Sequence, residues 1–206
     1  MTLLFVLSLG FVSGQERDFL TGDEVDQIRE AQDPNMRLQL YVQFAKVRVA
    51  LVQQLLSKEK PGRTALVHDT LEDYSHIIEA IDTVADDALK RKADLSEGMK
   101  GVAAAEREMA DSLEKLDTAP QKDYARYEFV LKQAIETTRD SADLSSQDLG
   151  ARASAVAERD KKDKKELESS MRPEEVKKKD AEEKKETAKK KAPTLRRKSE
   201  KPPDQR

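Results

Sequence analysis

The sequence predicts an all-α protein of antiparallel helical hairpins, packed as a coiled-coil-like bundle and followed by a charged tail. Apolar residues recur at alternating steps of four and three along much of the chain. Helix caps and a proline–glycine break separate these runs, whereas the alternation and tight turns typical of strands are missing. Charged residues make up 38% of the chain, well above the roughly 25% of ordinary globular domains. Part of the chain is therefore expected to lie outside any core.

The first element is a ten-residue apolar run from Leu3 to Val12. It is too short to span a membrane, which takes about 20 residues, but it suits the apolar part of a secretory signal. Small residues follow at Ser13 and Gly14, so we expect residues 1–14 to be a signal peptide. The protein is then exported to the periplasm or secreted to the exterior. No Lys or Arg precedes the run, unlike most signals. The alternative is an N-terminal helix packed on the domain.

Residues 15–157 are expected to form the folded helical domain, because no aromatic residue lies beyond Phe129 and a sizeable core needs them. Thr21 and Glu24 have capping-box spacing, which predicts a short helix ending near Ala31.

A second helix is predicted from Pro34 to about Glu59. Asp33 suits its N-cap and Pro34 its first position, and the sequence Lys60-Pro61-Gly62 ends it. Two neighbouring apolar stripes run along it: Leu38, Val42, Ala45, Val49, Val52 and Leu56 in one, and Tyr41, Phe44, Leu51 and Leu55 in the other. So wide an apolar surface indicates burial against more than one neighbour.

The longest periodic pattern comes next and has the seven-residue repeat of a coiled-coil or bundle seam. Its fifteen positions, here called the seam, are Val67, Leu71, Tyr74, Ile78, Ile81, Ala85, Ala88, Lys92, Leu95, Met99, Val102, Glu106, Met109, Leu113 and Leu116. Only Lys92 and Glu106 are not apolar. Because the phase never slips, we favour one long central helix over about 64–117, with or without a kink near Gly98. The alternative is a turn at 94–101, with Asp94 starting a new helix, which gives a compact four-helix bundle.

A last helix is predicted from Pro120, a residue that suits a first helical position. Its weaker seam consists of Tyr124, Tyr127, Leu131, Ile135, Thr138, Ala142 and Leu149. We expect the helix from Pro34 to pack on the first half of the long element, and the helix from Pro120 on its second half.

Residues 158–206 are expected to form a charged, mostly disordered or fraying tail. They contain nineteen Lys or Arg against thirteen Asp or Glu, a net charge of +6, while the remainder of the chain has −9. Up to about Lys191 positive and negative side chains are interspersed, and oppositely charged pairs four residues apart favour a transient helix. The proline-bounded end is more basic. Its candidate contacts with an anionic surface are Lys189, Lys190, Lys191, Arg196, Arg197 and Lys198. A solvated tail without a partner is the alternative, and nucleic acid is not an expected partner.

Few residues are candidates for catalysis or metal binding. Without cysteine there can be no disulfide, thiolate metal site or cysteine nucleophile. His68, Glu72 and His76 share one helix face and are a candidate divalent-metal site, although an exposed face with favourable pairs is the simpler interpretation. Asp82, Asp86 and Asp87 attract a hard cation or are only the polar face of a helix. Since catalytic and nucleotide-binding motifs are missing, we expect that the protein is not an enzyme and binds no cofactor.

The sequence therefore predicts a non-enzymatic exported protein with a structural, spacer or protein-interaction role. Two alternatives remain at this stage: a module that docks on an anionic envelope surface through its basic end, and a divalent-metal-binding helical protein. The seam also offers a surface for a second copy or for a partner helix.

Overall fold

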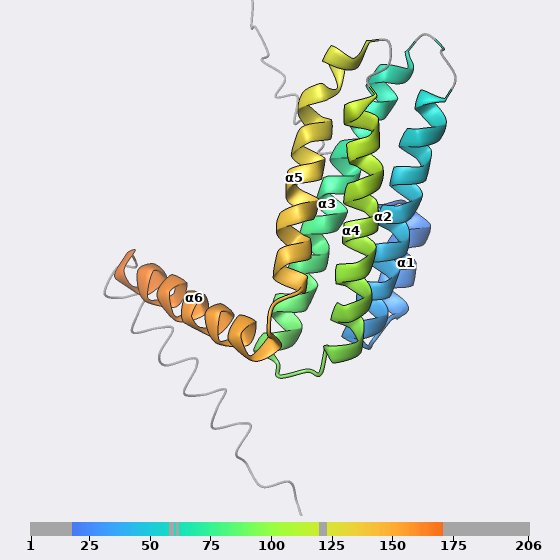
Figure 1. The fold of residues 1–206 in the computed structure, drawn as a ribbon. Helices are drawn as coiled ribbons and strands as arrows, with labels where there is room; N and C mark the ends of the chain where they lie inside the picture. Colours follow the sequence, from blue (N-terminus) through green and yellow to red (C-terminus); the bar gives the residue numbers. More distant parts are fainter. Residues whose placement is uncertain (1–17, 58–59, 61, 120–122, 171–206) are drawn as a thin grey trace, which may run out of the picture. The chain divides into compact units, whose positions relative to one another are not determined.

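All regular structure in the described part of the chain is helical, as predicted (Figure 1). The computed structural model describes residues 18–57, 60, 62–119 and 123–170, so the expected signal peptide and the basic end lie outside it. The chain divides into two units, residues 1–156 and 157–206. The helices are α1 (Gly22–Glu30), α2 (Pro34–Leu56), α3 (Arg63–Lys90), α4 (Ser96–Thr118), α5 (Glu128–Ser145) and α6 (Leu149–Ser170), with a 3-10 helix η1 (Tyr124–Arg126) before α5.

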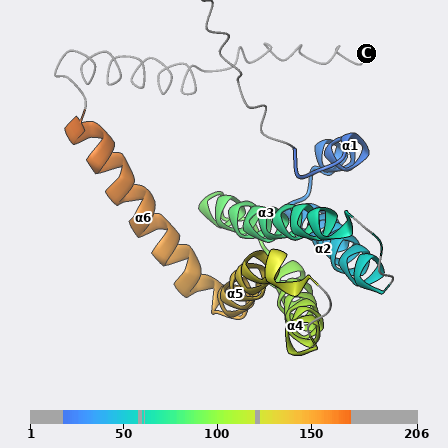
Figure 2. The same cartoon turned by 90° about the horizontal axis from the view of Figure 1, so that it is seen from above.

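The first unit is a four-helix bundle made of two antiparallel hairpins. Helix α2 pairs with α3 and α4 pairs with α5, which confirms the predicted pairing. Contacts between α3 and α5 and between α2 and α4 close the ring, so its order is α2, α3, α5, α4 (Figure 2). The connection from α3 to α4 therefore crosses the bundle diagonally.

The single long central helix over 64–117 is wrong. Helix α3 ends at Lys90 in a Schellman motif, in which Lys92 N–H donates to Leu89 O at 2.9 Å and Ala93 N–H to Ala88 O at 3.0 Å. Lys92 has a φ of 58°, in the left-handed region that such a cap requires. The interruption of the seam at Lys92 therefore marks a turn.

The seam keeps its phase through this turn because the turn has a suitable length. Ala88 and Leu95, seven residues apart, are both fully buried, although one lies at the end of α3 and the other just before α4. Asp94 accepts a hydrogen bond from Ser96 N–H at 2.9 Å, which lowers the pKa of Asp94 and helps start α4. A constant seven-residue spacing thus does not require one continuous helix.

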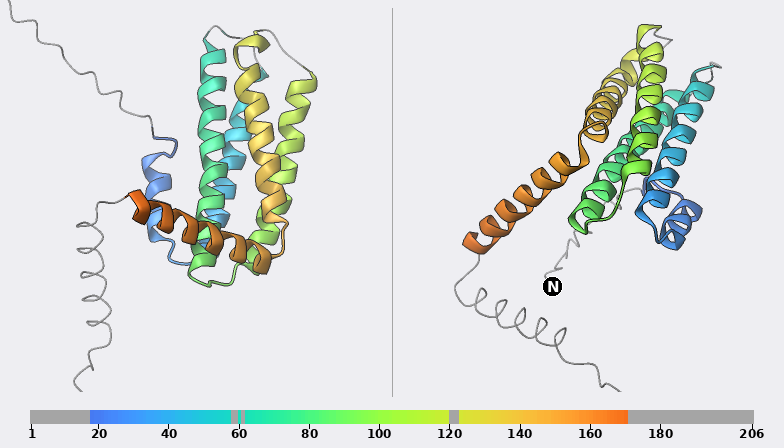
Figure 3. Two further views of the ribbon diagram at one scale, coloured as in Figure 1. Left: turned by 90° about the vertical axis from the view of Figure 1, so that its left-hand side faces the viewer. Right: turned by 60° about the horizontal axis from the view of Figure 1, so that its bottom comes forward.

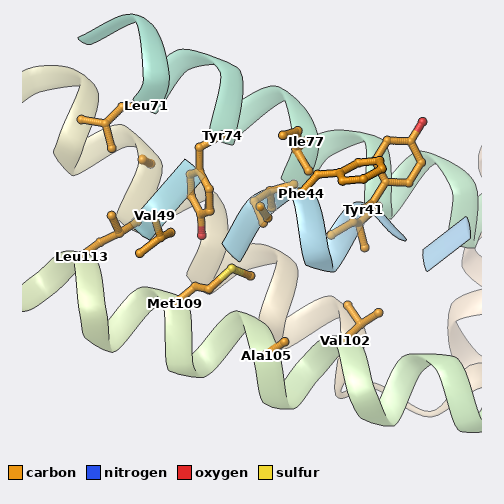
Figure 4. Close-up of a cluster of buried hydrophobic side chains, with 14 of the residues drawn as sticks. Tyr41, Phe44, Val49, Leu71, Tyr74, Ile77, Val102, Ala105, Met109 and Leu113 are labelled. Atoms are coloured by element: carbon orange, nitrogen blue, oxygen red, sulfur yellow. The ribbon is translucent and has the colours of Figure 1, made fainter. Parts of the chain in front are cut away.

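The seam forms the centre of the bundle. Every apolar seam residue is buried except Leu116, which is half-buried. Side chains of α2, α3 and α4 meet there, and Tyr74 points from α3 into the space also occupied by Val49 and Met109 (Figure 4). Because its own chain buries the seam, the seam surface is not exposed for a partner helix.

The predicted helix starts are confirmed for α1 and α2. Thr21 and Glu24 form the capping box, and Asp33 accepts from Asn35 N–H at 3.0 Å with Pro34 at the first position. The last helix, predicted from Pro120, begins as α5 at Glu128 after η1, and Asp123, before η1, has a φ of 61°. Residues 120–122 lie outside the described residues.

Helix α1 lies against α2 and is held there by a buried ion pair (Figure 3). Both terminal nitrogens of Arg48 donate to the Glu24 carboxylate at 2.7 Å, and Nη2 also donates to Phe19 O at 3.1 Å. The carboxylate that completes the capping box thus also fixes α1 to the bundle.

The first two turns of α6 belong to the bundle, where Arg152 and Val156 are buried. In the second unit, described only to Ser170, the helix continues from Ala157, and each side chain described there is exposed. The first part of the expected tail is therefore helical, and it presents no buried face.

Candidate functional site

The most unusual chemistry in the described residues is a polar cluster inside the bundle. It brings together residues that the sequence places far apart: Asp82 and Asp86 from α3, Glu106 from α4, Ser141 and Ser145 from α5, and Arg152 from α6. We call these six residues the polar cluster. Each of the four helices contributes because its cluster residue occupies a position on the inward face.

Glu106 is the centre of the polar cluster. It occupies a seam position and has no exposed surface. Its Oε1 accepts a hydrogen bond from Ser141 Oγ at 2.8 Å, while its Oε2 is buried without a hydrogen-bond partner among the described residues. Ser145 lies close enough to favour the ionised carboxylate but outside hydrogen-bond geometry.

Arg152 supplies the positive charge. Its side chain is 3% exposed, its Nε donates to Asp86 at 2.8 Å, and its Nη2 donates to Asp82 at 3.1 Å. Nη2 also lies 3.4 Å from the carbonyl oxygen of Asp82. Two carboxylates on successive turns of α3 thus bind the guanidinium group of Arg152, which lies near the start of α6.

Burial raises the pKa of two carboxyls of the polar cluster, Glu106 and Asp82. It raises the pKa of Glu106 to about 7, against the hydroxyls of Ser141 and Ser145, and the nearby Asp82 raises it further while Arg152 lowers it. Burial also raises the pKa of Asp82, although Ser141 and Arg152 oppose that shift. Glu106 is therefore partly protonated near neutral pH, which reduces the excess of negative charge around a single arginine.

The arrangement of the polar cluster is better suited to anchoring α6 on α3 than to catalysis. A catalytic carboxyl must reach a substrate, whereas Glu106 is fully buried and lines neither of two grooves between α4 and α5, of 490 and 700 Å³. Ser145 lines the larger groove, but a serine needs a base in hydrogen-bond contact to become a nucleophile, and Ser145 Oγ has no hydrogen-bond partner among the described residues. The polar cluster instead fixes the first turns of α6 to α3.

The sequence singles out three of the six residues of the polar cluster, Asp82, Asp86 and Glu106, but not Ser141, Ser145 or Arg152. Glu106 was visible as an interruption of the seam, and a charged residue at such a position needs a buried partner. Ser141 and Ser145 carry no such signal, because serine is common on exposed helix faces. Arg152 stands alone as a charged residue in a stretch of small residues, beyond the last aromatic residue Phe129, and nothing in its spacing indicates a buried partner.

The predicted metal set of His68, Glu72 and His76 is only partly brought together. His68 Nδ1 lies 3.6 Å from Glu72 Oε2 and 3.9 Å from Asp69 Oδ1, and ligand atoms of these three residues lie within 4.8 Å of one another. His76 instead lies 3.3 Å from Glu79 and its ring is 5.7 Å from that of Phe19. The side chains of His68 and Glu72 are about half exposed.

The acidic set on α3 also divides. Asp82 and Asp86 bind Arg152, whereas Asp87 lies 3.8 Å from Lys90. The cation held by this set is therefore a side chain of the same protein. The six basic residues between Lys189 and Lys198 lie outside the described residues, so their predicted contact with an anionic surface stays a prediction.

Comparisons with known protein families, with curated proteins and with solved structures found no match to this chain. Among the described residues, no helix is long and apolar enough to cross a membrane. The function must therefore be argued from the bundle and its polar cluster.

Proposed function

We propose that this chain is a non-enzymatic exported protein with a structural role, in which the helical bundle carries a charged helical segment that acts as a spacer or a protein-interaction element. The observation that supports this proposal most directly is the burial of Arg152 between Asp82 and Asp86. A buried arginine held by two carboxylates is costly to remove, so the base of α6 is fixed to α3.

The composition of α6 supports the same role. Beyond Val156 its residues are dominated by Lys, Arg, Asp and Glu, and those whose side chains are described are exposed up to Ser170. A helix without an apolar face gains nothing by packing on a core. Residues 157–170 are then available to act as a spacer that keeps the bundle apart from another component, or to bind a partner protein through electrostatic contacts.

The test is photo-crosslinking in the native cell with the full chain. A photoreactive residue is placed at Lys161 or Lys165 in the charged segment, and at the exposed Lys100 or Lys115 of α4 as matched controls. We expect defined adducts from the two segment positions and none from the bundle positions. Adducts from the bundle positions alone would contradict the proposal.

Export is tested separately. We expect the protein outside the cytoplasm with an N-terminus near Gln15, as read by N-terminal sequencing of the fractionated cell. An intact Met1 on protein in the cytosol would exclude the exported role, while leaving the structural role of the segment to the crosslinking result.

The alternative function is docking on an anionic envelope surface through the basic end, favoured by the +6 charge of residues 158–206. Sedimentation with anionic vesicles separates it from the proposal. If the full chain binds and a chain ending at Ser170 does not, and if salt abolishes the binding, the basic end is the functional element.

A further inference from the structure

The exposed face of α2 carries almost no charge. The exposed residues of α2, all of which are described, are Met36, Gln39, Gln43, Lys46, Val47, Ala50, Leu51, Gln53 and Gln54. Only Lys46 is charged, and its Nζ already lies 2.9 Å from Glu108 of α4. In a chain with 38% charged residues, a neutral exposed helix face is typical of an interface, where charged residues are depleted.

Apolar side chains form a stripe along this face. Met36 is 54% exposed, Val47 is 52% and Leu51 is 39%, and Leu40 is partly buried beside them. Since a helix turns by about 100° per residue, these four residues lie within roughly 60° of one another around α2. Their spacings of four, seven and four are those of residues that contact another helix.

The stripe is symmetric about its own midpoint between Gln43 and Phe44. Met36 lies as far before this point as Leu51 lies after it, and Leu40 and Val47 are related in the same way. In a two-fold contact each residue meets the symmetry-related position of the other copy. An antiparallel pair of α2 helices centred here places Met36 against the Leu51 of the second copy, and Leu40 against its Val47.

We propose that the Met36, Leu40, Val47 and Leu51 stripe of α2 binds the same stripe of a second copy of this chain, forming an antiparallel two-fold dimer. The face favours a second copy over a charged partner, because its one charged residue, Lys46, is already paired with Glu108 and the stripe itself has no charge to pair with a partner or to repel a second copy. The dimer goes beyond the proposed function and does not depend on the charged segment.

The contact is small. From Met36 to Leu51 the stripe is about 22 Å long at 1.5 Å per residue, and a helix is about 10 Å wide. The stripe therefore covers roughly 220 Å², much less than the roughly 800 Å² per partner of a stable interface. We therefore expect a reversible dimer that dissociates in roughly the micromolar range or above.

Sedimentation velocity of the full chain over about 1–300 µM tests the dimer, since a micromolar affinity is populated in that range. We expect the sedimentation coefficient to rise with concentration.

The double variant Met36→Glu/Leu51→Glu sets like charges against each other across the two-fold axis. We expect it to weaken association at least about 100-fold, since such like-charge contacts cost several kcal/mol. Gln53→Glu/Gln54→Glu adds the same charge to α2 off the paired positions and should weaken association less.

The double variant Met36→Glu/Leu51→Lys tests the register. Within one chain the two residues are too far apart to pair, but across the proposed axis each Glu meets a Lys of the other copy. We expect this variant to associate at least about tenfold more tightly than Met36→Glu/Leu51→Glu. Circular dichroism melting confirms that each variant is folded.

The proposal is overturned if the unmodified chain stays monomeric over the whole range, or if the two double variants at Met36 and Leu51 associate equally. It is also overturned if Met36→Glu/Leu51→Glu dimerises as tightly as the unmodified chain. A face reserved for a different protein would give the first of these results.

Discussion

At the scale of single residues, Glu106 has the largest predicted effect on stability. In the folded protein burial raises its pKa to about 7, whereas an unperturbed Glu has a pKa of 4.5. Between these values the folded state binds one proton more than the unfolded state, so the free energy of unfolding falls as the pH rises. The contribution of the protonated group is complete below about pH 4.5 and is lost by about pH 7.

Glu106→Gln tests this shift, because glutamine can still accept from Ser141 but does not ionise. At low pH the two proteins should be similarly stable. At pH 8 we expect the variant to be more stable by about 3 kcal/mol, at roughly 1.4 kcal/mol per pKa unit. Urea unfolding at several pH values measures the difference.

The same comparison needs a control because other groups titrate too. Asp82 has a raised pKa and acts in the same direction, whereas Glu24 has a lowered pKa and acts in the opposite direction. The difference between the chain and its variant cancels the contribution of Glu24, and it cancels that of Asp82 apart from the coupling between Asp82 and Glu106. Glu108→Gln, at a 70% exposed side chain of the same helix, keeps Glu106, so its free energy of unfolding should vary with pH in parallel with that of the unmodified chain. A parallel pH dependence in the chain and Glu106→Gln would refute the buried-acid interpretation.

The histidines give a second prediction at this scale. His68 lies near Asp69 and Glu72, and imidazole nitrogen with carboxylate oxygen is a donor set that binds Zn²⁺. We expect weak Zn²⁺ binding that His68→Ala removes and His76→Ala leaves within about twofold, because His76 lies apart beside Glu79. Calorimetric titration of the untagged full chain measures both. Equal losses in the two variants would restore the set predicted from sequence.

At the scale of helices, the two glycines at the start of α4 have different structural roles. A Cβ on Gly98 would lie 2.4 Å from Asn35 Oδ1, the atom that accepts from Gly98 N–H at 3.2 Å. Asn35 also donates to Asp94 O at 2.9 Å, so it connects the start of α2 to the turn before α4. A Cβ on Gly101 would have nothing within 4 Å.

Gly98→Ala and Gly101→Ala form a matched pair. We expect Gly101→Ala to raise the free energy of unfolding by about 0.5–1 kcal/mol, since alanine is the better helix former. Gly98→Ala should lower it by about 1 kcal/mol, because the displaced Asn35 loses its hydrogen bonds. Thermal and urea unfolding measure both. Equal stabilisation by the two substitutions would mean that Asn35 moves without cost.

At the scale of the whole molecule, the boundary between the units lies inside α6, after Val156. A chain ending at Ser170 should therefore unfold at the same urea midpoint as the full chain. A chain ending at Asp148 loses Arg152 and Val156 and leaves Asp82 and Asp86 without their cation. We expect it to be less stable by about 3 kcal/mol, the typical cost of breaking a buried pair. If removing residues 149–206 proves harmless, the anchoring role of Arg152 is wrong.

The helices, most of their caps and the hairpin pairing could be predicted because they depend on local chemistry and periodicity. Thr21, Glu24, Asp33 and Pro34 act within one turn of the chain, and every position of the seam except Lys92 and Leu116 is buried. The same seam could not show where a helix ends. A turn of the right length preserves a seven-residue spacing, so the Schellman motif at Lys92 was hidden within a continuous pattern.

The sequence by itself determined that the chain is helical and where its apolar faces lie. It also determined that charged residues become more frequent toward the C-terminus. Each of these features follows from residue type and spacing. Only the tertiary structure decided which polar residues meet. Glu106, Ser141, Asp82 and Arg152 come from four helices, and their contact depends on the ring order of the bundle. Phe19, which precedes α1, likewise meets His76 of α3, with ring centroids 5.7 Å apart. Contacts between distant segments depend on packing, which local periodicity does not specify.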